Sequence, residues 1–197
     1  MKKAWLIGFN VITLLVWGVY FLHAMLNGLQ FDQQSPFLLV LAQGLAIFEI
    51  MNAMLGIVGA NWLLTTIQVL SRFLVVVLLI WIPAERWVEI SHYSTVTGFM
   101  LISIAWSITE ITRALYYLTE TGNKPIKAIT LCRYTFFILL YPVGVVGEFL
   151  VMFAFWEYRQ FQVNVINLSL AAIALSYLVF FPKLYMHMWK QRTKKLA

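Results

Sequence analysis

Two residues that could exchange protons with a substrate, Tyr141 and Glu148, lie seven positions apart in the sequence YPVGVVGE. A carboxylate can accept a proton and a phenol can donate one, so the pair has the composition of an acid/base site. In a helix, seven residues make almost two turns, which would place both side chains on one face about 10 Å apart along the axis. Pro142 favours a kink, and Gly144 and Gly147 would let a substrate or a second helix approach the backbone. The alternative is a helix-packing motif with an interfacial tyrosine.

The elements that position this pair must be membrane helices. Of the 197 residues, 62% are hydrophobic and only 11% are charged, and the mean hydropathy is +0.83. This composition lies far outside the range of soluble domains and is typical of an integral membrane protein. The predicted fold class is all-α, with one membrane-embedded domain over residues 1–197 built as a six-transmembrane-helix bundle. Apolar runs long enough to span a bilayer cover residues 5–25, 36–59, 62–82, 94–118, 128–156 and 164–188.

The first three apolar runs are predicted to be separate membrane helices. Only Gly59, Ala60 and Asn61 separate the second run from the third. We expect a tight helical hairpin there, because about 47 apolar residues cannot form a single span. The first run follows two lysines, as in a signal peptide. Its length of about 21 residues and the lack of a small-residue cleavage pattern predict that it stays as a helix.

Basic residues predict the orientation of the bundle. If the amino terminus is cytosolic, only Arg86 and Arg159 lie on the opposite side. This strong positive-inside bias places both termini in the cytosol, which agrees with an even number of spans. The charges are divided among short loops and tails, so nucleic acid is not a predicted partner. The basic residues on the cytosolic side would be Lys2, Lys3, Lys124, Lys127, Lys190, Arg192, Lys194 and Lys195.

Three arginines and three glutamates fall inside the predicted helices. Each would cost at least about 2.5 to 3.5 kcal/mol at a bilayer centre, so we expect them to face the bundle interior. Equal numbers of each sign allow mutual pairing, and Glu110 and Arg113 could pair directly at positions i and i+3. Glu148 differs from the others, because its own helix offers no basic residue three or four positions away. The six are Glu49, Arg72, Glu110, Arg113, Arg133 and Glu148.

Five stretches, in order along about three quarters of the chain, resemble the very-long-chain 3-hydroxyacyl-CoA dehydratase family, whose members are also called protein tyrosine phosphatase-like proteins. Asn52 is a departure, at a position where the resemblance leads us to expect histidine. The family's catalytic tyrosine and glutamate, in a YPxGxxGE motif, match Tyr141 and Glu148. The five stretches are LAIFEIMNAMLGIVG, TTIQVLSR, WSITEITRALYY, CRYTFFILLYPVGVVGE and LYMHMWKQR.

The resemblance implies removal of water from a 3-hydroxyacyl-CoA to give the trans-2-enoyl-CoA, the third step of a fatty-acid elongation cycle. The thioester acidifies its α-hydrogen, so such an enzyme needs a base there and a proton donor for the departing hydroxyl. We assign Glu148 as the base and Tyr141 as the donor, to the hydroxyl or to the thioester oxygen, while the reverse assignment stays open. Neither a metal nor an organic cofactor is required. The three histidines, His23, His92 and His187, are too scattered to predict a metal site.

The same resemblance implies a substrate site and a cellular setting. The acyl tail would occupy a slot between helices, and the CoA phosphates would meet cations at the cytosolic mouth. The expected partners are the substrate, membrane lipid and the other elongation-cycle enzymes, namely elongase, ketoacyl reductase and enoyl reductase. The final residues KKLA resemble a dilysine retrieval signal, which predicts a multi-pass protein of the endoplasmic reticulum membrane. Candidate substrate-binding residues are Arg72, Glu110, Arg113, Lys124, Lys127, Arg133 and Arg192.

Other functions compete with this one. A phosphatase would need a nucleophilic cysteine and an arginine six places later, but Cys132, the one cysteine, is followed at that position by Ile138. A thiol buried in a membrane helix also disfavours a reactive thiolate. Two alternatives stay open: a non-catalytic scaffold or elongase adaptor, and a small transporter whose broken helix and buried charges line a path.

Overall fold

The computed structural model describes the backbone of residues 2–30, 34–82 and 92–196, and the side chains of the same residues except 92–95. Six helical stretches among them are long and apolar enough to span a membrane, with α2 and α3 together forming one and α6 and α7 another. The predicted all-α, six-span membrane protein is therefore confirmed. The helices are α1 (Lys2–Leu26), α2 (Ser35–Gly44), α3 (Ala46–Met54), α4 (Trp62–Trp81), α5 (His92–Thr121), α6 (Lys127–Arg133), α7 (Phe137–Tyr158) and α8 (Val165–Leu196).

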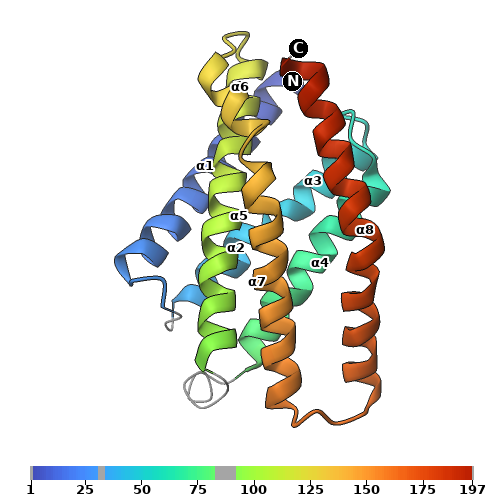
Figure 1. The fold of residues 1–197 in the computed structure, drawn as a ribbon. Coiled ribbons are helices and arrows are strands. Elements are labelled where there is room, and N and C mark those ends of the chain that lie inside the picture. Colours follow the sequence, from blue (N-terminus) through green and yellow to red (C-terminus); the bar gives the residue numbers. More distant parts are fainter. Residues whose placement is uncertain (1, 31–33, 83–91, 197) are drawn as a thin grey trace.

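Both termini lie at one end of the bundle, together with α6 (Figure 1). The basic residues that the sequence predicts to be cytosolic therefore share this end, here called the terminal end. Arg159 follows α7 at the opposite end, and Arg86 lies outside the described residues. Which end faces the cytosol stays a prediction. Inside the bundle α5 packs against α1 and α7, while α4 and α8 each pack against α7.

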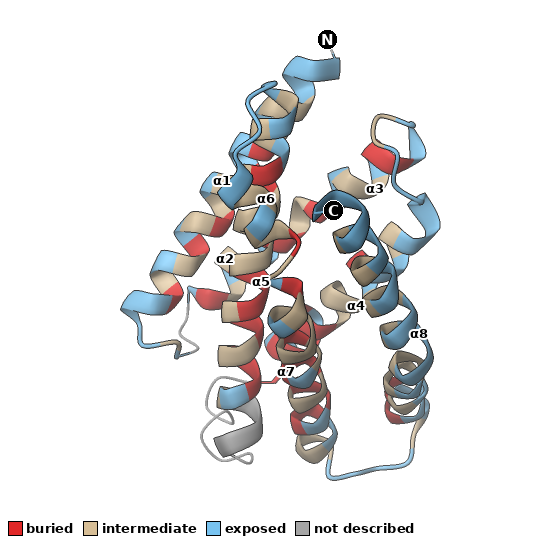
Figure 2. Ribbon diagram, turned by 45° about the horizontal axis from the view of Figure 1, so that its top comes forward, coloured by how far each residue is buried: buried red, intermediate tan, exposed pale blue. Residues whose placement is uncertain are grey.

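The closest helix packing joins α5 to α7. A Cβ atom on Gly147 would lie 2.8 Å from Cγ2 of Ile102 and 3.0 Å from the backbone oxygen of Gly98. Only glycine fits at such separations, and small residues of this kind let membrane helices approach closely. The contact fixes the position of α7 along α5, and with it the position of Glu148, the next residue. Figure 2 shows the buried residues concentrated on these two helices and a largely exposed α8.

The second predicted run ends earlier than expected and is not a single helix. A break after Gly44 divides it into α2 and α3, and α3 ends at Met54, five residues before the predicted end at 59. Gly56 takes a left-handed conformation with φ of +63° and turns the chain. Asn61 then caps α4, because its side chain accepts hydrogen bonds from the backbone N–H groups of Leu63 and Leu64. The predicted hairpin is present, with a connection of residues 55–61.

The fifth predicted run is interrupted at residues 134–136, between α6 and α7, and α7 continues through Pro142. Proline has no N–H, so it leaves the carbonyl four residues earlier, that of Ile138, without its helical partner. The hydroxyl of Tyr185 on α8 donates to this carbonyl at 3.1 Å. A side chain from the neighbouring helix therefore satisfies the acceptor that proline leaves free.

Candidate active site

A cavity of about 520 Å³ lies between α4, α5, α7 and α8, with residues of α3 and α6 also in its wall. Both Tyr141 and Glu148 line it, so the two residues marked by their spacing open onto the same space. On α7 the lining extends from Phe137 to Glu148, which at 1.5 Å per residue is about 16 Å along the helix. The cavity therefore reaches from near the terminal end to the middle of the bundle.

Glu148 is buried, and each of its two carboxylate oxygens accepts one hydrogen bond. Tyr177 on α8 donates its hydroxyl to Oε2 at 2.6 Å. Trp106 on α5 donates its indole Nε1–H to Oε1 at 3.3 Å. Two donors from different helices hold the carboxyl group in one orientation. A carboxylate has about four acceptor positions, so two remain for a substrate proton.

Tyr141 lies one turn inside the cavity from Phe137 and is held by an amide and two aromatic rings. Gln68 on α4 donates its Nε2–H to the phenol oxygen at 3.4 Å. The Tyr141 ring is stacked with Phe181, with centroids 5.6 Å apart and an interplanar angle of 14°. It also stacks with Tyr185 at 6.5 Å and 18°. These contacts fix the ring, while the phenol oxygen accepts a hydrogen bond and keeps its own proton for another partner.

Four of the other intramembrane charges form a chain of ion pairs along the same cavity. The Arg113 guanidinium pairs with both carboxylate oxygens of Glu49 and, at 2.5 Å, with Glu110. Glu110 pairs in turn with Arg72 at 2.5 Å. The predicted Glu110–Arg113 pair is therefore present, and the chain links α3, α5 and α4. Such pairing is what makes buried charges tolerable inside a bilayer.

Arg72 is the member of this chain closest to the proposed reaction. Its guanidinium carbon lies 5.4 Å from the centroid of the Trp106 ring, a distance typical of a cation–π contact. The same indole donates to Glu148. Trp106 therefore connects the ion-pair chain to the candidate base, and it places a fixed positive charge close to the carboxylate.

The cavity brings together some of the predicted substrate-binding residues and not others. Arg72, Glu110, Arg113 and Arg133 line it. Three more cations do not belong to its lining. Lys124 and Lys127 are exposed, just before and at the start of α6, and Arg192 lies over the Trp189 ring at 5.4 Å. Their part in substrate binding stays a prediction.

Three polar residues of this site were not predicted from the sequence. Gln68 and Trp106 occur in two of the stretches that carry the family resemblance, TTIQVLSR and WSITEITRALYY, and this was the one available signal. Tyr177 lies in none of those stretches. Its role depends on where α8 crosses α7, and neither local pattern nor spacing reveals that crossing.

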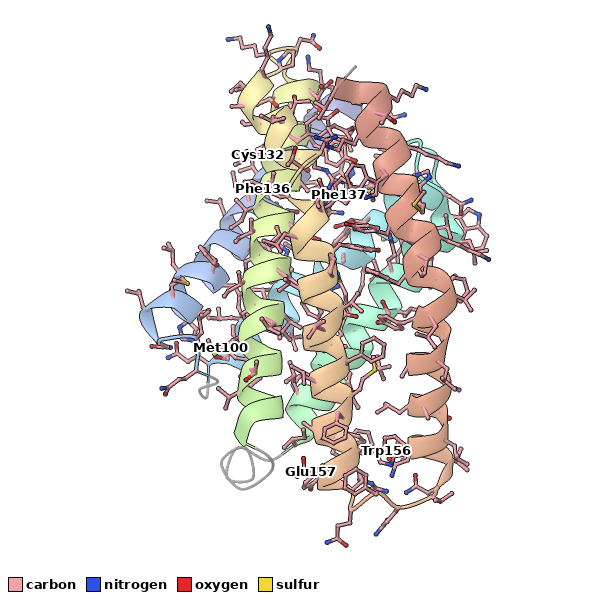
Figure 3. The ribbon with its side chains drawn as sticks, in the orientation of Figure 1. Met100, Cys132, Phe136, Phe137, Trp156 and Glu157 are labelled. Carbon is pink, nitrogen blue, oxygen red and sulfur yellow. The ribbon has the colours of Figure 1, made fainter. Side chains whose placement is uncertain are left out.

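The described residues contain no group of three His, Cys, Asp or Glu side chains that could hold a metal ion. Cys132, a free thiol, lies on α6 near the terminal end (Figure 3). It is half-buried, where sequence analysis expected burial, and it is not among the residues that line the cavity. The site among these residues consists of a carboxylate, two phenols, an amide donor, an indole donor and a set of paired charges.

Comparison with known proteins assigns the family. Residues 43–197 match the family model described as "Protein tyrosine phosphatase-like protein, PTPLA". The mouse protein named very-long-chain (3R)-3-hydroxyacyl-CoA dehydratase 2 is 34% identical over all of this chain and 82% of its own length. The Caenorhabditis elegans dehydratase hpo-8 is 33% identical over 99% of this chain and 95% of its own length. A protein of Schizosaccharomyces pombe named as a probable dehydratase of the same kind is 31% identical over 98% and 93%.

No solved structure matches the chain. The family model covers well over half of the sequence, and the relatives are matched over most of both lengths. The chain therefore belongs to the protein tyrosine phosphatase-like family, whose curated members compared here carry the name very-long-chain (3R)-3-hydroxyacyl-CoA dehydratase.

Proposed function

We propose that the protein is a very-long-chain (3R)-3-hydroxyacyl-CoA dehydratase, a hydro-lyase that converts its substrate to the trans-2-enoyl-CoA. The names of the full-length relatives support this reading. The observation that carries it is the placement of Tyr141 and Glu148 on one cavity within the bundle. A base and an acid that open onto the same cavity are what an elimination of water requires.

The reaction breaks the C–H bond at the α-carbon and the C–O bond at the β-carbon, and it forms the double bond between them. Glu148 accepts the α-proton. Tyr141 gives its proton to the departing hydroxide, which leaves as water. The proton on Glu148 then returns to the Tyr141 phenolate, directly or through a water molecule, and both groups are restored. General acid and base catalysis of this kind each contribute about 10² to 10⁴ in rate.

Gln68 supports the role of Tyr141 as the proton donor. Its amide N–H already points at the phenol oxygen, so the phenol acts there as an acceptor and its own O–H is directed elsewhere. When Tyr141 loses its proton, the same amide stabilises the phenolate without reorganising. Preorganised donors of this kind are a major source of rate acceleration.

Arg72 supplies a positive charge where negative charge develops. Removal of the α-proton moves charge onto the thioester oxygen, and a fixed cation in a site screened from water stabilises such an oxyanion. Glu110 and Trp106 hold Arg72 in place. In this scheme Glu110 is a positioning residue, and Arg113 and Arg133 extend the cationic surface toward the terminal end, where CoA would enter past Lys124, Lys127 and Arg192.

The proposed setting follows from the chemistry. A 3-hydroxyacyl-CoA is made by reduction of a ketone, and the enoyl product is consumed by reduction of its double bond. We therefore propose an elongase, a ketoacyl reductase and an enoyl reductase as partners. A cytosolic terminal end is the orientation that the distribution of basic residues predicts, and we propose residence in the membrane of the endoplasmic reticulum. The full-length relatives are named as dehydratases and not as scaffolds or transporters, so the dehydratase is the better reading.

Turnover by the purified protein tests this function. The full chain in lipid nanodiscs should convert a long-chain (3R)-3-hydroxyacyl-CoA to the enoyl-CoA and should also catalyse the reverse hydration, both followed by mass spectrometry. The Tyr141→Phe/Glu148→Gln double variant, prepared in parallel, controls for contaminating enzymes. Folded wild-type protein with no more turnover than this variant would exclude the enzyme and favour the scaffold or transporter.

A further inference from the structure

The cavity is too small for the whole substrate of the proposed function, on which this inference rests. A methylene packed at the density of a protein interior occupies roughly 25 Å³, so 520 Å³ would hold about 20 methylenes and nothing else. The same space must also take the thioester, the hydroxyl-bearing carbon and part of the pantetheine arm. Part of a very long acyl chain must therefore lie outside it.

The walls of the cavity differ in how exposed their residues are. On α5 and α7 the lining includes the buried residues Trp106 and Glu148, next to the tight glycine contact between these helices. On the other side, α4 and α8 contribute residues that line the cavity and are also exposed. Leu70 of α4 is 59% exposed and Phe180 of α8 is 40% exposed. The cavity is therefore closed on the α5–α7 side and open between α4 and α8.

This opening lies at the depth of the hydrocarbon core. Leu70 is the ninth of 20 residues in α4, and Phe180 is the sixteenth of 32 in α8, so both are near the middle of a span. An aqueous solute would not enter there, whereas an alkyl chain would leave the cavity into a medium of the same kind. Gln68, two residues earlier on α4, also lines the cavity and donates its amide N–H to Tyr141.

We propose that the acyl chain leaves the active site sideways, through a slot between Leu70 of α4 and Phe180 of α8, and extends into the lipid. The cavity then holds only the reacting end of the substrate. Carbons beyond the slot contact lipid and not protein, so the site sets no upper limit on chain length. One such enzyme can therefore act on the products of elongation cycles that differ in chain length.

Blocking the slot with a bulky group tests the proposal. Leu70→Cys in a Cys132→Ser background, labelled with a large membrane-permeant maleimide, should lose at least about tenfold in turnover of a substrate with roughly 24 acyl carbons. A substrate with roughly 8 carbons ends inside the cavity, so its turnover should change by less than about twofold. The matched control is Val77→Cys, which is exposed two turns further along α4 and does not line the cavity; its labelling should affect neither substrate. Phe180→Cys, with Val179→Cys as control, repeats the test from α8.

Several outcomes would contradict the proposed exit of the acyl chain through this slot. An equal loss of turnover for both substrates would mean that the label fills the part of the cavity that binds the reacting end. No loss for either substrate would mean that the acyl chain lies elsewhere. A thiol at this depth of a membrane reacts slowly, so Leu70→Trp, with Val77→Trp as its control, repeats the test without labelling; no selective loss of the long substrate in Leu70→Trp would also overturn the slot. If the unlabelled variants and the wild type turn over neither substrate, the proposed function fails instead, so the two failures are distinguishable.

Discussion

The hydroxyl of Tyr185 donates a hydrogen bond to the backbone carbonyl of Ile138 at 3.1 Å. Pro142 has no N–H to donate to that carbonyl, so a side chain of α8 takes the place of the missing backbone donor in α7. Tyr185 also stacks with the Tyr141 ring. One residue thus stabilises the proline turn and positions the candidate proton donor next to it.

Removing this hydroxyl should destabilise the protein in a manner that depends on Pro142. Tyr185→Phe leaves a carbonyl unsatisfied inside the membrane, and we expect a loss of about 1 to 3 kcal/mol in unfolding free energy. In a Pro142→Ala background the restored N–H can bond to Ile138, so the same substitution should cost much less. Thermal unfolding of the four proteins measures the coupling. Equal costs in both backgrounds would show that Tyr185 does not act through the proline.

Much of this architecture could be predicted from the sequence, because hydropathy reports directly on spans in a bilayer. The turn at Asn61 was also visible, as a polar residue between two apolar runs. The interruption at residues 134–136 was not, since no glycine or proline lies there and the proline that marked the segment is Pro142, further along the chain. Tyr177 was hidden for another reason: its contact with Glu148 is set by helix crossing and not by local spacing.

Tyr141→Phe and Glu148→Gln should each abolish most turnover while the protein still folds. Both substitutions keep the side-chain volume, and they remove the phenol proton or the base. We expect losses of about 10² to 10⁴ in kcat for each, measured on the long-chain substrate in nanodiscs. The double variant should be little worse than the slower single variant, because the two groups act on one transition state. Near wild-type kcat in both single variants would remove these residues from the mechanism.

Tyr177→Phe tests the positioning of Glu148. It removes the 2.6 Å hydrogen bond that orients the carboxylate and leaves the aromatic ring in place. Since the carboxylate acts in the chemical step, we expect kcat to fall about tenfold or more with little change in KM. The control is Tyr20→Phe, which removes a buried hydrogen bond to Ser103 at 2.7 Å away from the cavity lining. That variant should lose stability and keep its kcat; the same kinetic loss in both variants would mean that the Tyr177 effect is merely structural.

The two glycines beside Glu148 should respond differently to substitution. A Cβ on Gly147 meets the backbone of α5 at 3.0 Å, whereas one on Gly144 meets its nearest neighbour, the Ala105 side chain, at 3.6 Å. Backbone cannot move aside as a side-chain end can, so Gly147→Ala should force α5 and α7 apart and cost about 1 to 3 kcal/mol. Gly144→Ala should leave the melting temperature nearly unchanged. Equal melting temperatures for the two variants would contradict the close contact.

The cations at the terminal end should act on substrate capture and not on the chemical step. Lys124 and Lys127 are exposed and Arg192 is half-buried, and all three lie outside the cavity lining, so they can attract CoA phosphates without reaching the acyl group. This attraction is similar in the ground state and the transition state, so replacing all three by alanine should raise KM and leave kcat nearly unchanged.

Salt should mimic that substitution. Exposed charges are screened beyond about 8 Å at physiological ionic strength, so the wild-type KM should rise with added salt and the triple variant should respond less. The measurement is KM against salt concentration for both proteins, with the orientation of each checked by glycosylation acceptors placed in the carboxyl tail. Acceptors on a cytosolic tail stay unmodified. Identical salt curves from two correctly inserted proteins would show that these residues serve membrane topology alone, because a phosphate-binding cation cannot be removed without reducing the dependence on ionic strength.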